Sequence, residues 1–296
     1  MNLEILTDKV ISYLSDDPSF CVNAGLSKNL GLLPDPGKNK LIQKQGHLRL
    51  LSKLVKNFGR DSLSADERVD IKLIELLIEQ ENVKYELEVD GVLDIFKKPV
   101  ASSVIMDSIY TLLVNDDRDI KYRLVNIISK IKNIPEYLLS VQRNLNKPVS
   151  RWVDVEIDSI EGIDTFFDSI RDIARLNDFK NIKALDEYIK KALASKKRYV
   201  DYLKICDKSS NFKIGLDQTK RIIKSNGINL SVEEIHKMAV DFNHSNVKNL
   251  KKFRSDLILK YQLDQDTSDK ELQDYLNEKF KVLDVLGSYK KITNEL

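Results

Sequence analysis

The distribution of proline is the feature that most constrains the fold of this chain. All six prolines lie in the first half, and none occurs between Val149 and Leu296. Only four of the ten glycines lie in that second half. Proline breaks helices and glycine weakens them. The second half is therefore expected to be nearly all helical.

Apolar side chains recur at the helical period along most of the chain, which predicts a series of amphipathic helices. Clear examples are Leu3, Leu6, Val10 and Leu14; Leu48, Leu51 and Val55; Ile120, Leu124, Ile127 and Ile131; Tyr137, Leu138, Val141 and Leu145; Ile182, Leu185, Ile189 and Leu193; and Leu250, Phe253, Leu257 and Tyr261. No run bounded by turn residues alternates with period two. We therefore predict an all-α protein, an antiparallel helical bundle or array with little or no strand.

Local signals mark where several helices begin and end. Three capping boxes, in which a serine is followed three residues later by a glutamate, start at Ser64, Ser231 and Ser268. Pro135 is expected to end one helix and Pro148 to open another. The acidic residues after that second start are interpreted as its first turns, favoured by the helix dipole: Asp154, Glu156 and Asp158.

The change in proline content suggests two parts. Residues 1–148 would form an N-terminal helical part with proline-containing loops, including the turn-rich segment 31–39. Residues 149–296 would form a proline-free part made of long helices. We expect the two parts to pack as one continuous domain.

The charge balance gives no reason to expect a nucleic-acid or membrane partner. The chain has 48 Lys and Arg against 46 Asp and Glu, a net charge of +2, which makes no strong electrostatic field. No apolar run approaches the ~20 residues that cross a bilayer, and the first residues lack the basic and apolar regions of a signal peptide. Cys21 and Cys206 are expected to be buried or half-buried thiols in a reducing cytosol. We therefore predict a cytoplasmic location.

The histidines give little support for catalysis or metal binding. Glu233 with His236, and Asp241 with His244, share a helix face in the way that di-iron bundles use, but such a site also needs carboxylates from facing helices. We interpret both histidines as surface residues, and His47 as a surface residue near a helix start. No phosphate-binding glycine loop is present. The sequence thus predicts no catalytic residue, no metal ligand and no cofactor.

The turn before residue 150 is the candidate contact site. It brings together, in sequence, Arg143, Asn144, Arg151 and the single tryptophan, Trp152. Tryptophan and arginine are enriched at interface hot spots, so this corner is a candidate groove or partner surface. The alternative is that Trp152 simply packs against the edge of the core.

Several short segments occur in an order that resembles a known family. They are Ala24-Gly25-Leu26 with Pro34-Asp35; Pro99 to Leu113, with Ile109-Tyr110; Ile134-Pro135-Glu136-Tyr137-Leu138; Asn144-Leu145 before Pro148; Asn211-Phe212 to Gly215-Leu216; and Leu230-Ser231 to Ile235. Over nearly the whole chain they resemble domain of unknown function family 885 of bacteria and archaea. Two positions depart from its pattern, Asn211 for aspartate and Ile214 for leucine.

The resemblance carries expectations about function. Full-length members resemble zinc metallopeptidases and carry a His-Glu-x-x-His helix in their C-terminal half, whereas no two histidines here are four residues apart. The resemblance therefore maps this chain onto the helical N-terminal half, ending near Leu296. It implies that this half is non-catalytic by itself. It would form one side of a substrate cleft, or dock on a separately encoded zinc-bearing subunit, in a metallopeptidase-like hydrolase.

Two alternatives stay open beside this hypothesis. One is a stand-alone helical protein, a scaffold or a peptide-binding protein, that has kept the fold and lost the active site. The other is an enzyme that uses residues of this chain, His236 among them. A helical half would also expose an apolar face, so a heteromer or self-association is expected, with the interface toward the last helices, in residues 231–296.

Overall fold

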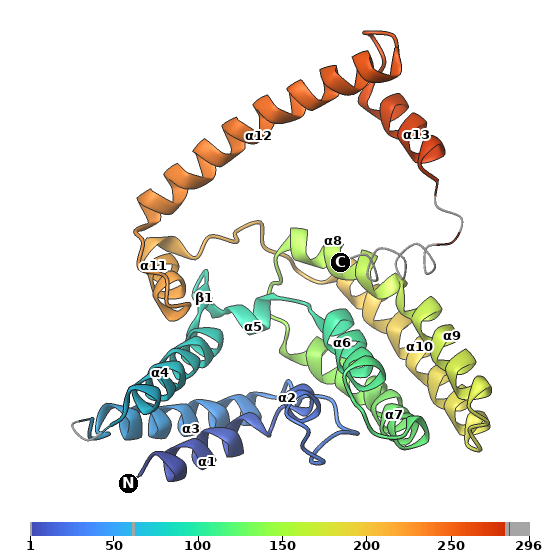
Figure 1. Ribbon diagram of the computed structural model, residues 1–296. Coiled ribbons are helices and arrows are strands. Elements are labelled where there is room, and N and C mark those ends of the chain that lie inside the picture. The colour runs from blue at the N-terminus through green and yellow to red at the C-terminus, as the bar shows by residue number, and fades with distance from the viewer. Residues whose placement is uncertain (1, 61–62, 282–283, 285–296) are drawn as a thin grey trace. The chain divides into compact units, whose positions relative to one another are not determined.

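The structure is a computed structural model that describes residues 2–60, 63–281 and 284. It is built almost entirely of helices, which confirms the all-α class predicted from the sequence (Figure 1). The chain divides into two compact units, residues 1–229 and residues 230–296. The change in proline content at residue 148 lies inside the first unit, where Val149 is buried and forms a bridge with Ser209.

The first unit contains eleven of the helices and one small hairpin among its described residues. The helices are α1 (Leu3–Leu14), α2 (Pro18–Asn23), α3 (Lys38–Lys56), α4 (Ala65–Glu86), α5 (Asp94–Lys97), α6 (Ala101–Val114), α7 (Ile120–Asn144), α8 (Ser150–Glu161), α9 (Ile163–Leu176), α10 (Ile182–Ile205) and α11 (Gly215–Ser225). The hairpin pairs β1 (Glu88–Val89) with β2 (Val92–Leu93) in antiparallel fashion.

Two hydrophobic cores hold the first unit together. The smaller one forms where α1, α3 and α4 pack against one another, around Leu6, Leu48 and Ile71. The larger one forms around α6 and α7, with α8, α9 and α10 packed over them. Its central contact joins the two long helices α7 and α10, which run side by side in Figure 1. Both cores contain apolar stripes that the sequence predicted, those of α1, α3, α7 and α10, which face neighbouring helices.

Pro135 does not break a helix, contrary to the prediction from the sequence. It lies inside α7, which runs without interruption from Ile120 to Asn144. A proline in a helix interior costs about 3 kcal/mol, because it removes one hydrogen bond and crowds the preceding turn. The residues on either side, Ile131, Ile134 and Leu138, are all buried in the larger core. Burial of one apolar face along the whole length of α7 outweighs the local cost.

Local capping signals are reliable in this chain. The capping boxes at Ser64, Ser231 and Ser268 are all present, and each serine hydroxyl accepts a hydrogen bond from the amide three residues later. The turn before α8 also occurs as expected, with Lys147 in the left-handed region at a φ of 45°. Side chains that bond to their own neighbours give signals that tertiary packing seldom overrides.

The acidic residues of α8 correct another interpretation. The first turn of α8 holds no acidic residue, because the helix already begins at Ser150. Asp154 and Asp158 are exposed, but Glu156 is buried. The inward face of α8 carries Val153, Glu156 and Ile160, which are spaced at the helical period. Glu156 is therefore a core residue and not part of a solvated acidic turn.

The second unit consists of α12 (Val232–Tyr261) and α13 (Asp269–Lys279). Its buried residues are few among those described: Ile258 and Leu272. The Tyr261 ring lies 5.6 Å from the ring of Tyr275, and Lys279 lies over the Tyr261 ring at 4.2 Å. These contacts hold the last turns of α12 against α13. They leave most of α12 without a packing partner among the described residues of its own unit.

Candidate functional site

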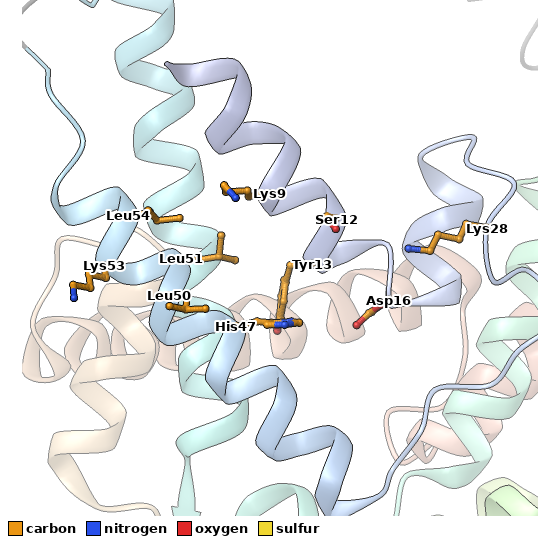
Figure 2. A pocket seen from close by; sticks show the side chains of 10 residues that line it. All are labelled: Lys9, Ser12, Tyr13, Asp16, Lys28, His47, Leu50, Leu51, Lys53 and Leu54. Carbon is orange, nitrogen blue, oxygen red and sulfur yellow. The ribbon is translucent and has the colours of Figure 1, made fainter. Parts of the chain in front are cut away.

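A groove between α1 and α3 is the candidate functional site. It has a volume of about 510 Å³ and lies at the surface of the smaller core (Figure 2). Its lining comes from α1, from the turn after α1, from the loop between α2 and α3, and from α3: Lys9, Ser12, Tyr13, Asp16, Lys28, His47, Leu50, Leu51, Lys53 and Leu54. Figure 2 shows Lys9 and Tyr13 on one wall, facing Leu51 and His47 on the other.

Helical spacing places these side chains along the groove. On α1, Lys9 and Tyr13 are four residues apart, so they lie one turn above another on the same face. On α3, His47, Leu51 and Leu54 follow the same rule. His47 lies in the middle of α3, not near its start as predicted, and it is exposed.

The groove combines an apolar wall with positive charge. Leu51 is buried and Leu54 half-buried, whereas Leu50 is 62% exposed. Within the part of the chain that the structure describes, the ammonium groups of Lys9, Lys28 and Lys53 form no ion pair with a carboxylate of the protein. An exposed leucine beside lysines that form no ion pair favours an anionic ligand with an apolar part.

The one acidic side chain of the groove is already neutralised. Asp16 accepts a hydrogen bond from Lys40 at 2.9 Å. Burial by itself would raise the pKa of Asp16, but the bond and charge of Lys40, with the charges of Lys44 and Lys28, outweigh burial and lower it. Asp16 is thus held as a carboxylate paired with Lys40. It offers little repulsion to an anion at the other lysines.

Tyr13 connects one wall of the groove to α4. Its hydroxyl donates a hydrogen bond of 2.6 Å to Glu81 of α4, and the ammonium group of Lys44 lies 5.9 Å from the centre of its ring. Burial, together with the bond to Glu81, raises the pKa of Tyr13 well above its usual range. The phenol therefore stays neutral and serves as a wall, not as an acid or base.

The four residues of the corner that the sequence predicted as a contact site have different surroundings. Arg143 is exposed and lines a groove of about 500 Å³ between α7 and α10. Asn144 lines a different cavity, and its side-chain amide donates to the carbonyl oxygens of Pro36 and Ser140. Trp152 is half-buried at the start of α8, beneath Lys98 at 5.0 Å. Arg151 is exposed. Arg143 and Asn144 are thus neighbours in sequence that face different spaces.

Of the residues considered for chemistry, His47 lines the groove. His236 and His244 are exposed on α12. Cys21 is buried and Cys206 half-buried, and both are free thiols, as predicted. Within residues 2–60, 63–281 and 284, no three His, Cys, Asp or Glu side chains gather in a way that could hold a metal ion.

Two charged groups, whose burial was not predicted from the sequence, lie in the larger core. Glu156 accepts hydrogen bonds from the amide and hydroxyl of Ser102, at 2.9 and 2.6 Å, yet burial raises its pKa to about 7. The ammonium group of Lys130 donates to the carbonyl oxygen of Leu32 at 2.6 Å, and burial lowers its pKa to about 8. Both groups tie core helices to a neighbouring element, so we assign them to the stability of the fold.

The groove could have been noticed from one detail of the sequence. Leu50 and Leu51 are consecutive, so their side chains point about 100° apart on a helix. One of them can pack into the core, and the other is then expected to lie at the surface. The lysines of the groove come from α1, from the loop before α3 and from α3 itself, and no local pattern connects these three segments.

Comparison with known proteins supports the fold alone. No protein-family model and no curated protein matches the sequence. A solved structure described as "a putative lipoprotein of unknown function from Shewanella oneidensis" matches with a TM-score of 0.68 at 14% sequence identity. The match covers 94% of this chain and 52% of the other, so this chain spans about half the length of that protein. No helix among the described residues is long and apolar enough to cross a membrane.

Proposed function

We propose that this chain is the helical half of a two-part protein and acts together with a second polypeptide segment. One observation carries the proposal: a fold that accounts for 94% of this chain accounts for only 52% of a longer solved chain. The helical fold is therefore found elsewhere as one part of a larger protein. The metallopeptidase-like class of the second part rests on the sequence resemblance to domain of unknown function family 885.

An apolar stripe on α12 is the surface that we assign to this contact. Ile235, Phe242 and Phe253 fall within roughly 20° of one line along the helix, given ~100° per residue. Phe242 and Phe253 are 69% and 61% exposed. Exposed phenylalanines in a row are typical of protein interfaces and rare on surfaces that face only water.

The stripe is better suited to a protein than to a lipid surface. Asn246 and Asn249 fall on the same side of α12 as the phenylalanines, between Phe242 and Phe253. Amide side chains in the middle of an apolar stripe are costly in hydrocarbon, since they need hydrogen-bond partners. In helix-to-helix contacts, such an asparagine fixes the register of the two helices. We therefore propose a helical segment of the second polypeptide as the partner.

Co-expression tests this proposal. The full chain would be produced with a polypeptide of the same genome that carries a His-Glu-x-x-His helix. We expect the two to purify as a 1:1 complex and zinc-dependent hydrolysis of a peptide library to require both. The double variant Phe242→Glu with Phe253→Glu should abolish the complex, while its circular dichroism remains helical.

A matched control uses apolar residues of the first unit that are even more exposed than the two phenylalanines. Leu176 and Ile205, at 82% and 84% exposure, lie at the ends of α9 and α10 in the first unit. Leu176→Glu with Ile205→Glu should leave the complex intact. Zinc-dependent hydrolysis by the purified chain alone, abolished by His236→Ala, would refute the proposal and place the activity in this chain.

A second candidate function is favoured by a separate observation. The groove between α1 and α3 lies wholly within the first unit and combines an apolar wall with unpaired lysines. Under this candidate, the chain is a stand-alone protein that binds a peptide in this groove. It would do so whether or not α12 has a partner, so the two candidates are tested by different variants.

A further inference from the structure

We infer that the groove between α1 and α3 selects an acidic peptide segment in which carboxylate side chains flank one or two large apolar residues. The inference rests on the second candidate function and names its ligand. It does not depend on the α12 contact. Three features of the groove carry it: the charge, the position of the charges, and the size of the apolar surface between them.

The charge of the groove selects an anion. Lys9, Lys28 and Lys53 form no ion pair with any residue that the structure describes, and the single carboxylate of the groove, Asp16, is paired with Lys40. The net charge of the whole chain is only +2. The positive groove is therefore a local feature and not a reflection of overall basicity, and a local cluster of one sign attracts the opposite sign.

The lysines lie at opposite ends of the groove. In Figure 2, Lys9 and Lys53 lie at the end marked by Leu54, and Lys28 lies at the other end, beyond Tyr13 and Asp16. A ligand with a single charge would satisfy only one end. A segment with carboxylates on both sides of its apolar residue reaches both ends.

The apolar surface matches one or two side chains. Leu50, Leu51 and Leu54 are the aliphatic residues that line the groove, and Leu50 is mostly exposed. A fatty acid would need a deeper apolar cavity to bury its chain, whereas a leucine or phenylalanine of a peptide needs only such a patch. Burying Leu50 under a ligand would also remove apolar surface from water, which favours binding.

Binding of defined peptides tests the inference. The probe is a fluorescein-labelled peptide of sequence Asp-Glu-Phe-Leu-Asp-Glu, titrated with the full chain and followed by fluorescence anisotropy. We expect saturable binding that weakens as salt is raised, because salt screens the ion pairs. A peptide with lysine in place of its four acidic residues should not bind. An acidic peptide with serine in place of phenylalanine and leucine should bind at least about fivefold more weakly.

Two matched pairs of variants locate the site. Lys9→Glu with Lys53→Glu should weaken binding by at least about tenfold, since two attractions become repulsions. Lys121→Glu with Lys183→Glu changes the net charge equally at exposed residues of α7 and α10 and should leave affinity unchanged. Leu50→Ser should weaken binding, and Leu176→Ser, at the exposed end of α9, should not. Circular dichroism verifies that each variant is folded.

Three results would overturn the inference. The first is equal affinity of the two lysine double variants, because binding would then depend on net charge alone. The second is equal affinity for the acidic peptide without its apolar residues, which would show that the leucines are not contacted. The third is displacement of a fluorescent fatty acid by laurate from the wild-type protein, with no binding of the acidic peptide. In that case the groove would serve a small amphiphile.

Discussion

Glu156 illustrates how one buried residue links this fold to pH. The pKa of a glutamate in an unfolded chain is near 4.5, whereas burial in the larger core raises the pKa of Glu156 to about 7, despite its hydrogen bonds to Ser102. Between these two values the folded state binds more protons than the unfolded state. The contribution of Glu156 to stability is therefore greatest below pH 4.5 and is lost as pH rises toward 7.

Replacement of Glu156 by glutamine should remove this dependence. Above pH 7 the Glu156→Gln variant should be more stable than the wild type by up to roughly 3 kcal/mol, the equivalent of the shift in pKa. Near pH 4.5 the two should be similar, because both side chains are then neutral. Urea unfolding followed by circular dichroism from pH 4.5 to 8 measures the difference. Glu161→Gln, at the exposed end of α8, should keep the wild-type dependence.

An unchanged pH dependence in the Glu156→Gln variant would contradict the burial effect assigned to this carboxyl group. The burial of Glu156 was not predicted from the sequence. Asp154, Glu156 and Asp158 are all acidic, so the sequence gives no reason to expect that one of them is buried and the others exposed. Only the register of α8 against the core decides which one is buried. That register is set by Val153 and Ile160, which are buried on the same face.

At the scale of elements, the sequence predicts the starts of helices better than their continuity. The three capping boxes formed as expected, because a serine hydroxyl and the amide three residues later are always close together. The hairpin at residues 88–93 also had a local signal, since Asp90 and Gly91, with φ values of 59° and 70°, form the tight turn that this pair favours. The hairpin was not predicted because its strands, of two residues each, are too short to show an alternating pattern.

Pro135 shows the opposite case, in which packing overrides a local signal. Its ring leaves the carbonyl group of Ile131 without the usual amide donor in α7. Replacement of Pro135 by alanine should restore that hydrogen bond and raise the free energy of unfolding by about 1–3 kcal/mol, less the entropy that proline removes from the unfolded chain. The urea midpoint at 222 nm measures this change.

Pro148 provides the comparison for this variant. It precedes α8 and lies outside any helix, so Pro148→Ala restores no helical hydrogen bond and should not stabilise the protein. A midpoint for Pro135→Ala equal to or below that of the wild type would show that α7 bears no penalty at its proline.

At the scale of the whole molecule, the sequence predicts which faces are apolar but not which faces meet. The candidate groove needs α1 to lie against α3, and its lysines come from three separate segments. No helical period links those segments, so the groove emerges only from the fold. The corner around Trp152 shows the converse: residues that are adjacent in sequence need not share a site. Arg143 and Asn144 are neighbours in the chain but line different spaces.

The two units should differ in their ability to fold alone. Every residue of both hydrophobic cores precedes position 204, well within residues 1–229. The last helix of the first unit, α11, is fixed to α4 by Arg221, which donates to Glu79 and Glu86 at 2.9 and 2.8 Å. A chain that ends at Asn229 should therefore keep the cooperative unfolding of the full chain, with a thermal midpoint within a few degrees of it.

The separated second unit should behave differently, because its described residues bury little apolar surface and long helices owe most of their stability to packing. A chain of residues 230–296 should lose most of its helicity at micromolar concentration and regain it when the partner of α12 is added. Circular dichroism of both fragments measures this. A fragment 1–229 that unfolds without cooperativity would mean that α12 and α13 stabilise the cores, and α12 could then no longer be treated as a surface left free for another polypeptide.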